Sequence, residues 1–544
     1  FKLVEDRVEY QSVVPYYIAE IYYFQNKKQE TIAYGESILS KGGLYYEKEL
    51  KQLLGQIYFE RKDFVRALPL LEYYVTNSKK VSKEDLYELS YCYYEARQLD
   101  KAIDGFKQLS NEKDSLGQNS MYLLGDCYLK TNDKSNARIA FQYCAYNSSN
   151  KKQQEISRFN YAKLSYELGY QDIALNEMKK FLAEYPESVY TTEAKEILVS
   201  LLTNTNNFKD ALVLFESFNK PTAAMQKQYP KILYGRAVEL INDQRVTDAD
   251  GLFTKIIQLP ASGVTPYAKF WKGEIAYRNA DYDMAIQQLT AFLNSNVPSQ
   301  GEANTAAAKY DLGYSWMKKE NYNQSSGYFE SIGKPSVTAT ALEQDAYVRN
   351  ADCVFMLRDF TKANAMYEMV INNALPQSDY AMFQKAMIAG IKSSANKIAV
   401  LNVLSRQYAQ SSLVPDANLE IANTYMADEK FNEAIPYLNN ILTAGNAGGL
   451  KPVAYLKLGL SNYNLNNNKE ALANYLKLMQ LYPQSAESDE ALYNIKNIYV
   501  EEGRPNEYVD LMKKTGKNIS VSEADSLTYA AAEIKYDAGN CSAA

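Results

Sequence analysis

The sequence contains no histidine in 544 residues and only two tryptophans. Without histidine, Ser-His-Asp and Cys-His catalysis, histidine metal ligands and histidine-based pH switching are excluded within these residues. The five cysteines include no Cys-x-x-Cys spacing, which argues against a metal or redox site. We therefore predict no catalytic residues and no bound metal, and we expect the protein not to be an enzyme.

Other common signatures are missing as well. No apolar run approaches the roughly 18 residues that a membrane helix needs, so we predict no transmembrane segment in this chain. The net charge is −6 and there is no stripe rich in lysine and arginine, so nucleic acid is not an expected partner. The chain has neither a Walker-type phosphate loop nor a Gly-x-Gly-x-x-Gly motif, and we expect no cofactor.

What the chain does contain is a repeated spacing of small residues. In ten places a small residue is followed by another one twelve positions later, as Gly55 is by Ala67 and Gly459 is by Ala471. The first residue of the pair recurs at steps such as 35 (Gly55 to Ser90) and 37 residues. Self-similarity at this period indicates a helical solenoid.

The local pattern explains why each unit is a pair of helices. Apolar residues recur with the helical period of 3.6 on both sides of a short polar turn, such as ERKD before Phe64 or RNAD before Tyr282. Small residues are expected where the two antiparallel helices of a pair come closest. One pair cannot cover its own apolar face, so its stability must come from stacking on its neighbours.

The residues that carry this pattern resemble the tetratricopeptide repeat, abbreviated TPR. Its Leu-Gly-x-x-Tyr start is matched by Leu54-Gly55 and Tyr58, and the following aromatic, alanine and apolar residues are matched by Phe64, Ala67 and Leu71. The resemblance covers nearly the whole chain. It implies an all-α fold, a right-handed superhelical solenoid of stacked antiparallel helix pairs.

The register divides the chain into three parts. We predict an N-terminal array of about ten repeats at residues 1–379, an irregular repeat and possible bend at 380–415, and a C-terminal array at 416–544. Within 380–415 the spacing fails, because Gly390 is followed twelve residues later by Asn402. The last repeat is truncated at Ala544, and we expect the native protein to continue.

The resemblance also implies that the first helix of each pair lines a concave surface. Positions three before and four after the small residue are seven apart and share one helix face, and aromatic residues recur there. Tyrosine combines a large contact area with a polar tip, which suits binding of an extended peptide or a helix. An alternative, which stays open, is that these rings only pack neighbouring first helices together. The candidate residues are Tyr16, Tyr23, Phe59, Tyr87, Tyr94, Tyr122, Asp126, Phe159, Tyr166, Tyr234, Phe270, Glu274, Tyr277 and Tyr310.

The cysteines follow the same register. Cys92, Cys127 and Cys353 each lie two positions after a small residue, and Cys144 lies in a second helix. Equivalent positions in stacked helices are about 8–10 Å apart, which is too far for a disulfide. We predict that they are small buried packing residues.

Two predicted second helices end in Tyr-Pro-x-Ser, at residues 185–188 and 482–485. This ending resembles the repeat subtype of Gram-negative envelope proteins, including outer-membrane assembly lipoproteins and the Tol–Pal-associated coordinator family. The resemblance implies a periplasmic or outer-membrane-associated protein. Unpaired cysteines do not support an oxidising compartment, so a cytoplasmic location is the alternative.

The leading functional hypothesis is a non-enzymatic scaffold that binds partner proteins or peptides along the concave groove, and the resemblance to envelope repeats suggests association with envelope complexes. One alternative is a glycan-binding outer-membrane lipoprotein built on the same kind of helices, although the two tryptophans and the uninterrupted period argue against it. A second alternative is the regulatory TPR array of a larger protein.

Overall fold

A computed structural model describes residues 1–517 and 519–539. Within these residues the chain forms 29 α-helices and no β-strand, so the predicted all-α fold class is confirmed. Within each of the two units named below, the helices form consecutive antiparallel pairs that pack on one another. Residues 1–268 form one compact unit and residues 269–544 form a second, and the two are described separately.

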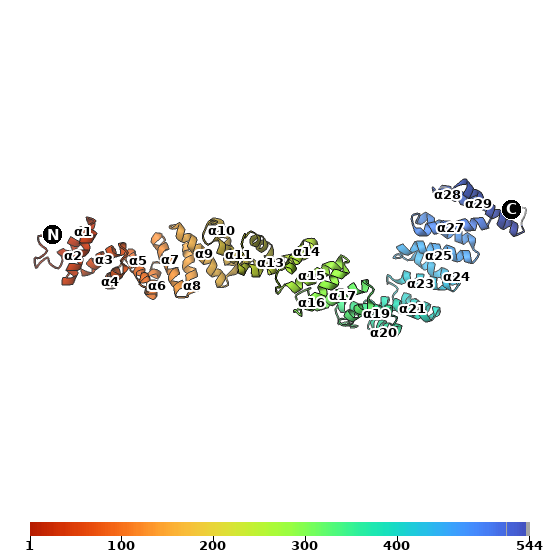
Figure 1. The fold of residues 1–544 in the computed structure, drawn as a ribbon, viewed down its shortest axis with the longest axis horizontal. Coiled ribbons are helices and arrows are strands. Elements are labelled where there is room, and N and C mark those ends of the chain that lie inside the picture. Colours follow the sequence, from red (N-terminus) through yellow and green to blue (C-terminus); the bar gives the residue numbers. More distant parts are fainter. Residues whose placement is uncertain (518, 540–544) are drawn as a thin grey trace. The chain divides into compact units, whose positions relative to one another are not determined.

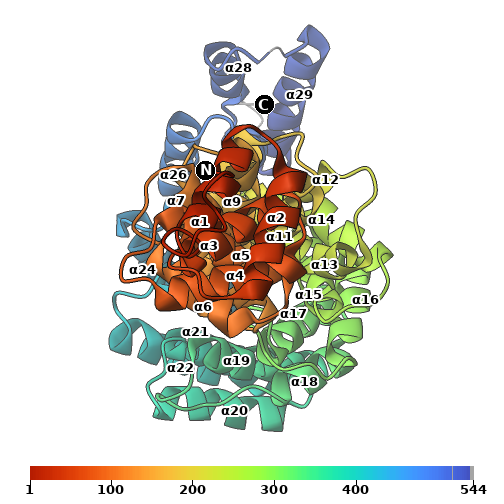
Figure 2. The same ribbon diagram turned by 90° about the vertical axis from the view of Figure 1, so that its left-hand side faces the viewer.

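In both units the odd-numbered helices are the first helices of their pairs and the even-numbered ones are the second helices (Figure 1). Figure 2 shows the first pair, α1 and α2, facing the viewer. Unit 1 contains α1 (Val14–Phe24), α2 (Lys28–Lys41), α3 (Glu47–Glu60), α4 (Phe64–Asn77), α5 (Lys83–Glu95), α6 (Leu99–Gln108), α7 (Ser115–Lys130), α8 (Lys134–Ala145), α9 (Lys151–Glu167), α10 (Gln171–Glu184), α11 (Thr191–Asn204), α12 (Phe208–Glu216), α13 (Ala223–Asn242) and α14 (Val246–Gln258).

Helix α15 (Thr265–Arg278) includes the boundary between the units, and residues from 269 onward belong to unit 2. Unit 2 continues with α16 (Tyr282–Leu293), α17 (Thr305–Lys318), α18 (Tyr322–Glu330), α19 (Ala341–Met356), α20 (Phe360–Asn372), α21 (Ser378–Lys392), α22 (Ser394–Gln407), α23 (Val414–Ala427), α24 (Phe431–Thr443), α25 (Lys451–Asn464), α26 (Asn468–Leu481), α27 (Ala486–Glu501), α28 (Pro505–Lys514) and α29 (Val521–Asp537).

The turn within a pair is a three-residue link that ends one helix and starts the next. Between α3 and α4, Lys62 has a left-handed backbone with φ of 59°. Its N–H donates to the carbonyl of Phe59, and the N–H of Asp63 donates to the carbonyl of Tyr58, both at 2.9 Å. This is the Schellman ending of a helix. The Asp63 carboxylate then accepts from the N–H of Arg66 and caps α4.

A left-handed residue occupies the same place in every other complete pair of the described chain but one. The exception is α21–α22, where Ser393 alone links the helices and caps α22 through the N–H of Asn396. The shorter link explains why the twelve-residue spacing fails there, since Gly390 lies against Lys397 instead. A bend at this pair stays a prediction.

The close approach within a pair differs in detail from the sequence prediction. A Cβ on Gly55 would lie 2.7 Å from the Leu71 side chain, so the small residue makes room for a large one sixteen positions later. The residue twelve positions later has another role. In α18, the Ser325 hydroxyl donates to the carbonyl of Gly313 at 2.7 Å and lies 3.1 Å from the Cys353 sulfur of α19. That position must be small because it lies between two first helices.

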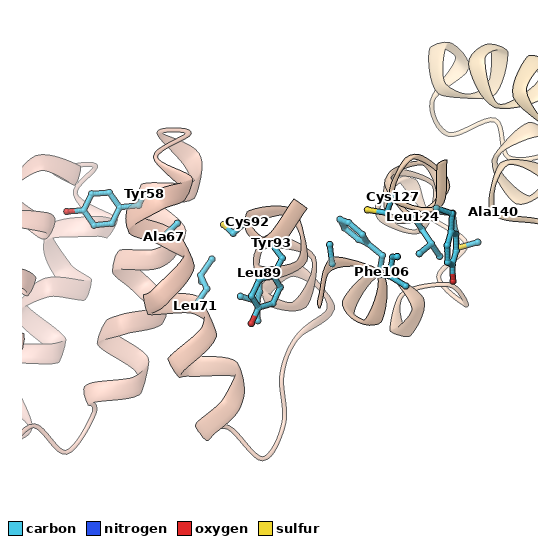
Figure 3. Close-up of a cluster of buried hydrophobic side chains, with 14 of the residues drawn as sticks. Tyr58, Ala67, Leu71, Leu89, Cys92, Tyr93, Phe106, Leu124, Cys127 and Ala140 are labelled. Carbon is cyan, nitrogen blue, oxygen red and sulfur yellow. The ribbon is translucent and has the colours of Figure 1, made fainter. Parts of the chain in front are cut away.

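The same packing forms the core between neighbouring pairs. Figure 3 shows Ala67 and Leu71 on the side of α4 that faces Leu89 and Cys92 of α5, and all four are buried. The four described cysteines are free and buried, which confirms the packing prediction. Burial also raises the pKa of the Cys92 thiol to about 12, so it is not a reactive thiolate. Cys541 lies outside the described residues.

Candidate protein-binding surface

All fourteen candidate residues lie on first helices, and we call the surface that the first helices form within each unit its first-helix face. Three of the fourteen are buried: Phe159 and Phe270 are each 2% exposed and Tyr234 is 8% exposed. Phe159 stacks on Tyr190 with ring centroids 4.6 Å apart, and Phe270 packs edge-on against Phe292. The packing alternative therefore holds for these three rings, because they offer almost no surface to a partner.

The other eleven are half-buried, and several are held in place by contacts between consecutive first helices. The hydroxyl of Tyr23 on α1 donates to Glu60 on α3 at 3.3 Å. The hydroxyl of Tyr94 on α5 donates to Asp126 on α7 at 2.6 Å, and the Lys130 ammonium lies 4.1 Å from the centre of the Tyr94 ring. These bonds fix the rings while leaving part of each side chain at the surface.

Tyr16 and Tyr87 on this face have raised pKa values and are neutral hydrogen-bonding groups at physiological pH. Burial, followed by the Glu20 carboxylate, raises the pKa of Tyr16 to about 12. Burial, followed by the neighbouring Tyr91, raises the pKa of Tyr87 to about 12. A ring next to a carboxylate or in an apolar site keeps its proton, so each free hydroxyl can donate to a partner.

Helix α5 also contributes two carboxylates that the sequence pattern did not single out. Asp85 is buried, and its Oδ1 accepts from the side-chain amides of Gln52 at 2.7 Å and Gln56 at 3.0 Å. Glu88 is half-buried, and its Oε2 is inaccessible and has no hydrogen-bond partner. Burial raises the pKa of Glu88 to about 7, with further contributions from Asp85, Glu60 and Glu84.

A second polar cluster lies in unit 2 around Asp345 on α19. The hydroxyls of Tyr310 and Tyr314 on α17 donate to its Oδ2 at 2.7 and 2.6 Å, and the Gln377 amide donates to Oδ1 at 2.7 Å. Burial would raise the pKa of Asp345, but the hydrogen bonds from Tyr314, Gln377 and Tyr310 outweigh it and lower the pKa. The predicted residue Tyr310 is thus part of a bonded network.

Arg349 extends this network along α19. Its guanidinium bonds Asp345 at 3.3 Å and Asp352 at 2.5 Å. Asp352 also accepts from the hydroxyls of Tyr367 on α20 and Tyr380 on α21, at 2.7 and 3.1 Å. Each carboxylate is fully engaged by donors from neighbouring helices, so the cluster binds α17, α19, α20 and α21 together rather than offering free groups to a ligand.

The predicted residue Glu274 belongs to a carboxyl pair. Asp311 on α17 is buried, and burial together with a hydrogen bond to the Glu274 carboxyl raises its pKa to about 9. Arg278 bonds Glu274 at 2.7 Å. Among the described residues no group of three histidine, cysteine or acidic side chains has the geometry to hold a metal ion.

Two of the helix pairs match a known family of repeats. The family model described as "Tetratricopeptide repeat" matches residues 119–150, which span most of α7 and α8, and residues 453–485, which span most of α25 and α26. The two matched helix pairs are tetratricopeptide repeats. Apart from α21–α22, the other complete pairs of the described chain have the same left-handed turn as the two matched repeats.

Solved structures similar to this chain include the crystal structure of the APC/C hetero-tetramer Cut9–Hcn1, which is 14% identical over 97% of each chain with a TM-score of 0.27. They also include the structure of Naa15/Naa10 bound to HypK-THB, which is 11% identical over 91% of this chain and 73% of that chain with a TM-score of 0.32. No curated protein matches the chain.

Proposed function

We propose that this protein is a non-enzymatic scaffold that holds protein or peptide partners on its first-helix face. The observation that carries the proposal is the bonded series of half-buried tyrosines and carboxylates on consecutive first helices, such as Tyr23 with Glu60 and Tyr94 with Asp126. TPR arrays commonly serve as scaffolds for protein interactions, and this fold alone does not specify the partner.

Side chains that are already held in place lower the entropy cost of binding a partner. A partner must immobilise each side chain that it contacts, at about 0.5–1.5 kcal/mol per flexible side chain. Tyr94 is already held by Asp126 and Lys130 before any partner arrives. Its ring can therefore contribute contact area with little further loss of entropy. The same holds for Tyr87, whose hydroxyl accepts a hydrogen bond from Asn119 at 3.4 Å.

A cross-linking pull-down tests the proposal. We would compare the wild-type chain with a triple variant, Tyr87→Ser, Tyr94→Ser and Tyr122→Ser, after checking its helicity and melting. The matched control is Tyr73→Ser on the second helix α4, where the ring is 38% exposed. The scaffold proposal expects a reproducible protein partner that the folded triple variant loses and the control keeps. A partner retained by both variants would contradict a binding role for these rings.

We also propose a setting in the bacterial cell envelope, periplasmic or outer-membrane-associated. The support is the Tyr-Pro-x-Ser ending of α10 and α26 and its resemblance to envelope repeats. The serine of this ending also has a structural role, because Ser485 caps α27 by accepting a hydrogen bond from the N–H of Ser488. No helix in the described residues is long and apolar enough to cross a membrane. Fractionation of the native cells against periplasmic and cytoplasmic markers tests the setting, and recovery with the cytoplasmic marker would contradict it.

A further inference from the structure

Charge is segregated between the two helix types in the first four pairs of unit 1. The first helices α1, α3, α5 and α7 carry nine carboxylates and four lysines. The second helices α2, α4, α6 and α8 carry five carboxylates and seven lysines or arginines. The negative charge therefore lies on the first-helix face and is not a general property of these repeats.

The segregation changes sign further along the same unit. The first helices α9, α11 and α13 carry eight lysines or arginines and five carboxylates. A partner that lies along this face thus meets a negative surface at α1 to α7 and a positive one beyond it. Electrostatic complementarity of this kind selects the partner and its orientation.

The negative charge is least compensated around α5. We define the acidic patch as Glu60, Glu84, Glu88 and Glu95, of which Glu60 alone has a lysine partner, Lys28 at 2.5 Å. Asp85 beside the patch is already satisfied by two glutamine amides, whereas Glu88 keeps a buried oxygen without any donor. A cation placed at Glu88 would supply the missing donor and offset the repulsion among the four carboxylates.

A hollow next to the acidic patch is lined in part by apolar side chains. It has a volume of about 400 Å³ and lies between the α3–α4 turn and the end of α5. Phe64 and the 86% exposed Val65 supply its apolar lining. Lys62 and Asp63 also line it. The Asp63 carboxylate is paired with Arg66 at 2.8 Å, so Glu95 is the carboxylate that remains for a cation from a partner. Lysine and arginine side chains combine an apolar stem with a charged end, which matches this lining.

Aromatic rings connect Glu88 and the hollow. Phe59, Phe64 and Tyr91 contact one another with ring centroids 5.2–5.6 Å apart. Tyr91 precedes Glu95 by one helical turn and follows Glu88 by three residues, so the ring lies on the face that both carboxylates share. Rings beside carboxylates favour cationic side chains through cation–π attraction.

We propose that α1, α3 and α5 bind an extended segment of a partner protein that is rich in lysine and arginine, with one cationic side chain at Glu88 and a second in the hollow beside Glu95. This inference rests on the scaffold function proposed above and names the chemistry of its partner. The positive first helices α9, α11 and α13 are not part of the binding surface for this segment.

The probe that tests it is a fluorescein-labelled peptide of alternating lysine and alanine, with a glutamate–alanine peptide as its counterpart. Fluorescence anisotropy measures the Kd for the full chain and for the double variant Glu88→Gln, Glu95→Gln. The matched control is Glu30→Gln, Asp100→Asn, which removes the same charge from exposed positions on the second helices α2 and α6. Circular dichroism verifies that all three proteins are folded.

The proposal expects the double variant to weaken binding of the lysine peptide by about tenfold or more, and the control to leave the Kd unchanged. The affinity should also fall between about 50 and 300 mM salt, because the contacts are ionic. Equal weakening in both variants, or no binding of the lysine peptide to the wild type, would overturn it. So would equally tight binding of the glutamate peptide.

The pull-down described above separates the two possible failures. If the triple tyrosine variant loses its partner but the lysine peptide does not bind, the scaffold function stands and the cationic partner is wrong. If the lysine peptide binds through Glu88 and Glu95 while the tyrosine variant keeps every partner, the acidic patch stands and the role of the predicted tyrosines is wrong.

Discussion

Replacing Gly313 by alanine tests the packing register, because the same change in the paired helix should have the opposite effect. A Cβ on Gly313 in α17 would lie 2.6 Å from Cε1 and 2.8 Å from Cδ1 of Phe329. Carbon atoms in contact are normally about 3.5–4.0 Å apart. Gly327 in α18 is exposed, and a Cβ there would meet no atom within 4 Å.

Both substitutions gain helix propensity of about 1 kcal/mol, because alanine restricts the unfolded chain and favours the helix. At Gly327 this gain stands alone, so the variant should be more stable than the wild type. At Gly313 it is opposed by overpacking of about 1–3 kcal/mol. Phe329 cannot move aside easily, since it is fully buried and its ring packs against Tyr310 and Tyr314. The two variants should therefore differ by about 1–3 kcal/mol.

Urea unfolding followed by tryptophan fluorescence measures this difference. The two tryptophans, Trp271 on α15 and Trp316 on α17, report on the repeats that contain or adjoin the substitutions. We expect the unfolding midpoint to fall for Gly313→Ala and to rise for Gly327→Ala. A Gly313→Ala protein that unfolds at the same urea concentration as Gly327→Ala, or at a higher one, would refute the register.

Three other substitutions test the turn, the acidic patch and the unit 2 network. Lys62→Gly should raise the free energy of unfolding by about 1 kcal/mol, because glycine adopts the left-handed turn without strain, whereas Lys48→Gly within α3 should lower it by a similar amount. Thermal melts measure both, and a loss of stability in Lys62→Gly would contradict the turn geometry. Burial and neighbouring carboxylates raise the folded-state pKa of Glu88 from 4.5 to about 7. Protonation of Glu88 therefore contributes its full stabilisation of the fold below about pH 4.5, and this contribution is lost as the pH rises through 7. Glu88→Gln should thus be more stable than the wild type by about 1–2 kcal/mol at about pH 8 and equally stable at about pH 4. Urea titrations measure both, and a variant as stable as the wild type at both pH values would count against the raised pKa of Glu88. Arg349→Met should cost about 3 kcal/mol by leaving two carboxylates without their shared cation, and an unchanged urea midpoint would show that the network adds no stability.

The fold could be predicted from the sequence because its main signal is local and repeated. Gly55, Tyr58, Ala67 and Leu71 recur with neighbours of the same kind, and each repeat reinforces the assignment of the others. The partner of the small residue was less visible. Sequence spacing emphasised Ala67 twelve residues after Gly55, whereas the side chain that fills the space is Leu71, because it lies one helical turn further along α4.

The left-handed turns carry little sequence signal. Residues such as Lys62, Arg97 and Glu320 adopt positive φ although their side chains do not favour it. The stacked helices on both sides of the link impose this conformation, so it follows from tertiary structure and not from local preference. The single-residue link at Ser393 was likewise detectable only as a failure of the spacing.

The placement of the candidate residues on first helices could be predicted, but the burial of each one could not. The repeat register placed all fourteen residues on first helices, yet it treated Phe159 and Tyr166 alike. Phe159 is buried because Tyr190, from the next repeat, stacks on it. Glu88 was missed because its raised pKa comes mainly from burial, followed by Asp85 and then by Glu60, which lies 28 residues earlier in another first helix. Such contacts between repeats follow from the structure and have no periodic signal in the sequence.

The most direct test of the account is site-specific photo-cross-linking in the native cells. A benzophenone amino acid would replace Tyr91 on the first-helix face and, in a second protein, Tyr73 on the second helix α4, and mass spectrometry would identify the attached peptides. The account predicts a protein cross-linked at Tyr91 and not at Tyr73, through a segment rich in lysine and arginine. A partner cross-linked at Tyr73 alone would contradict the first-helix face as the binding surface.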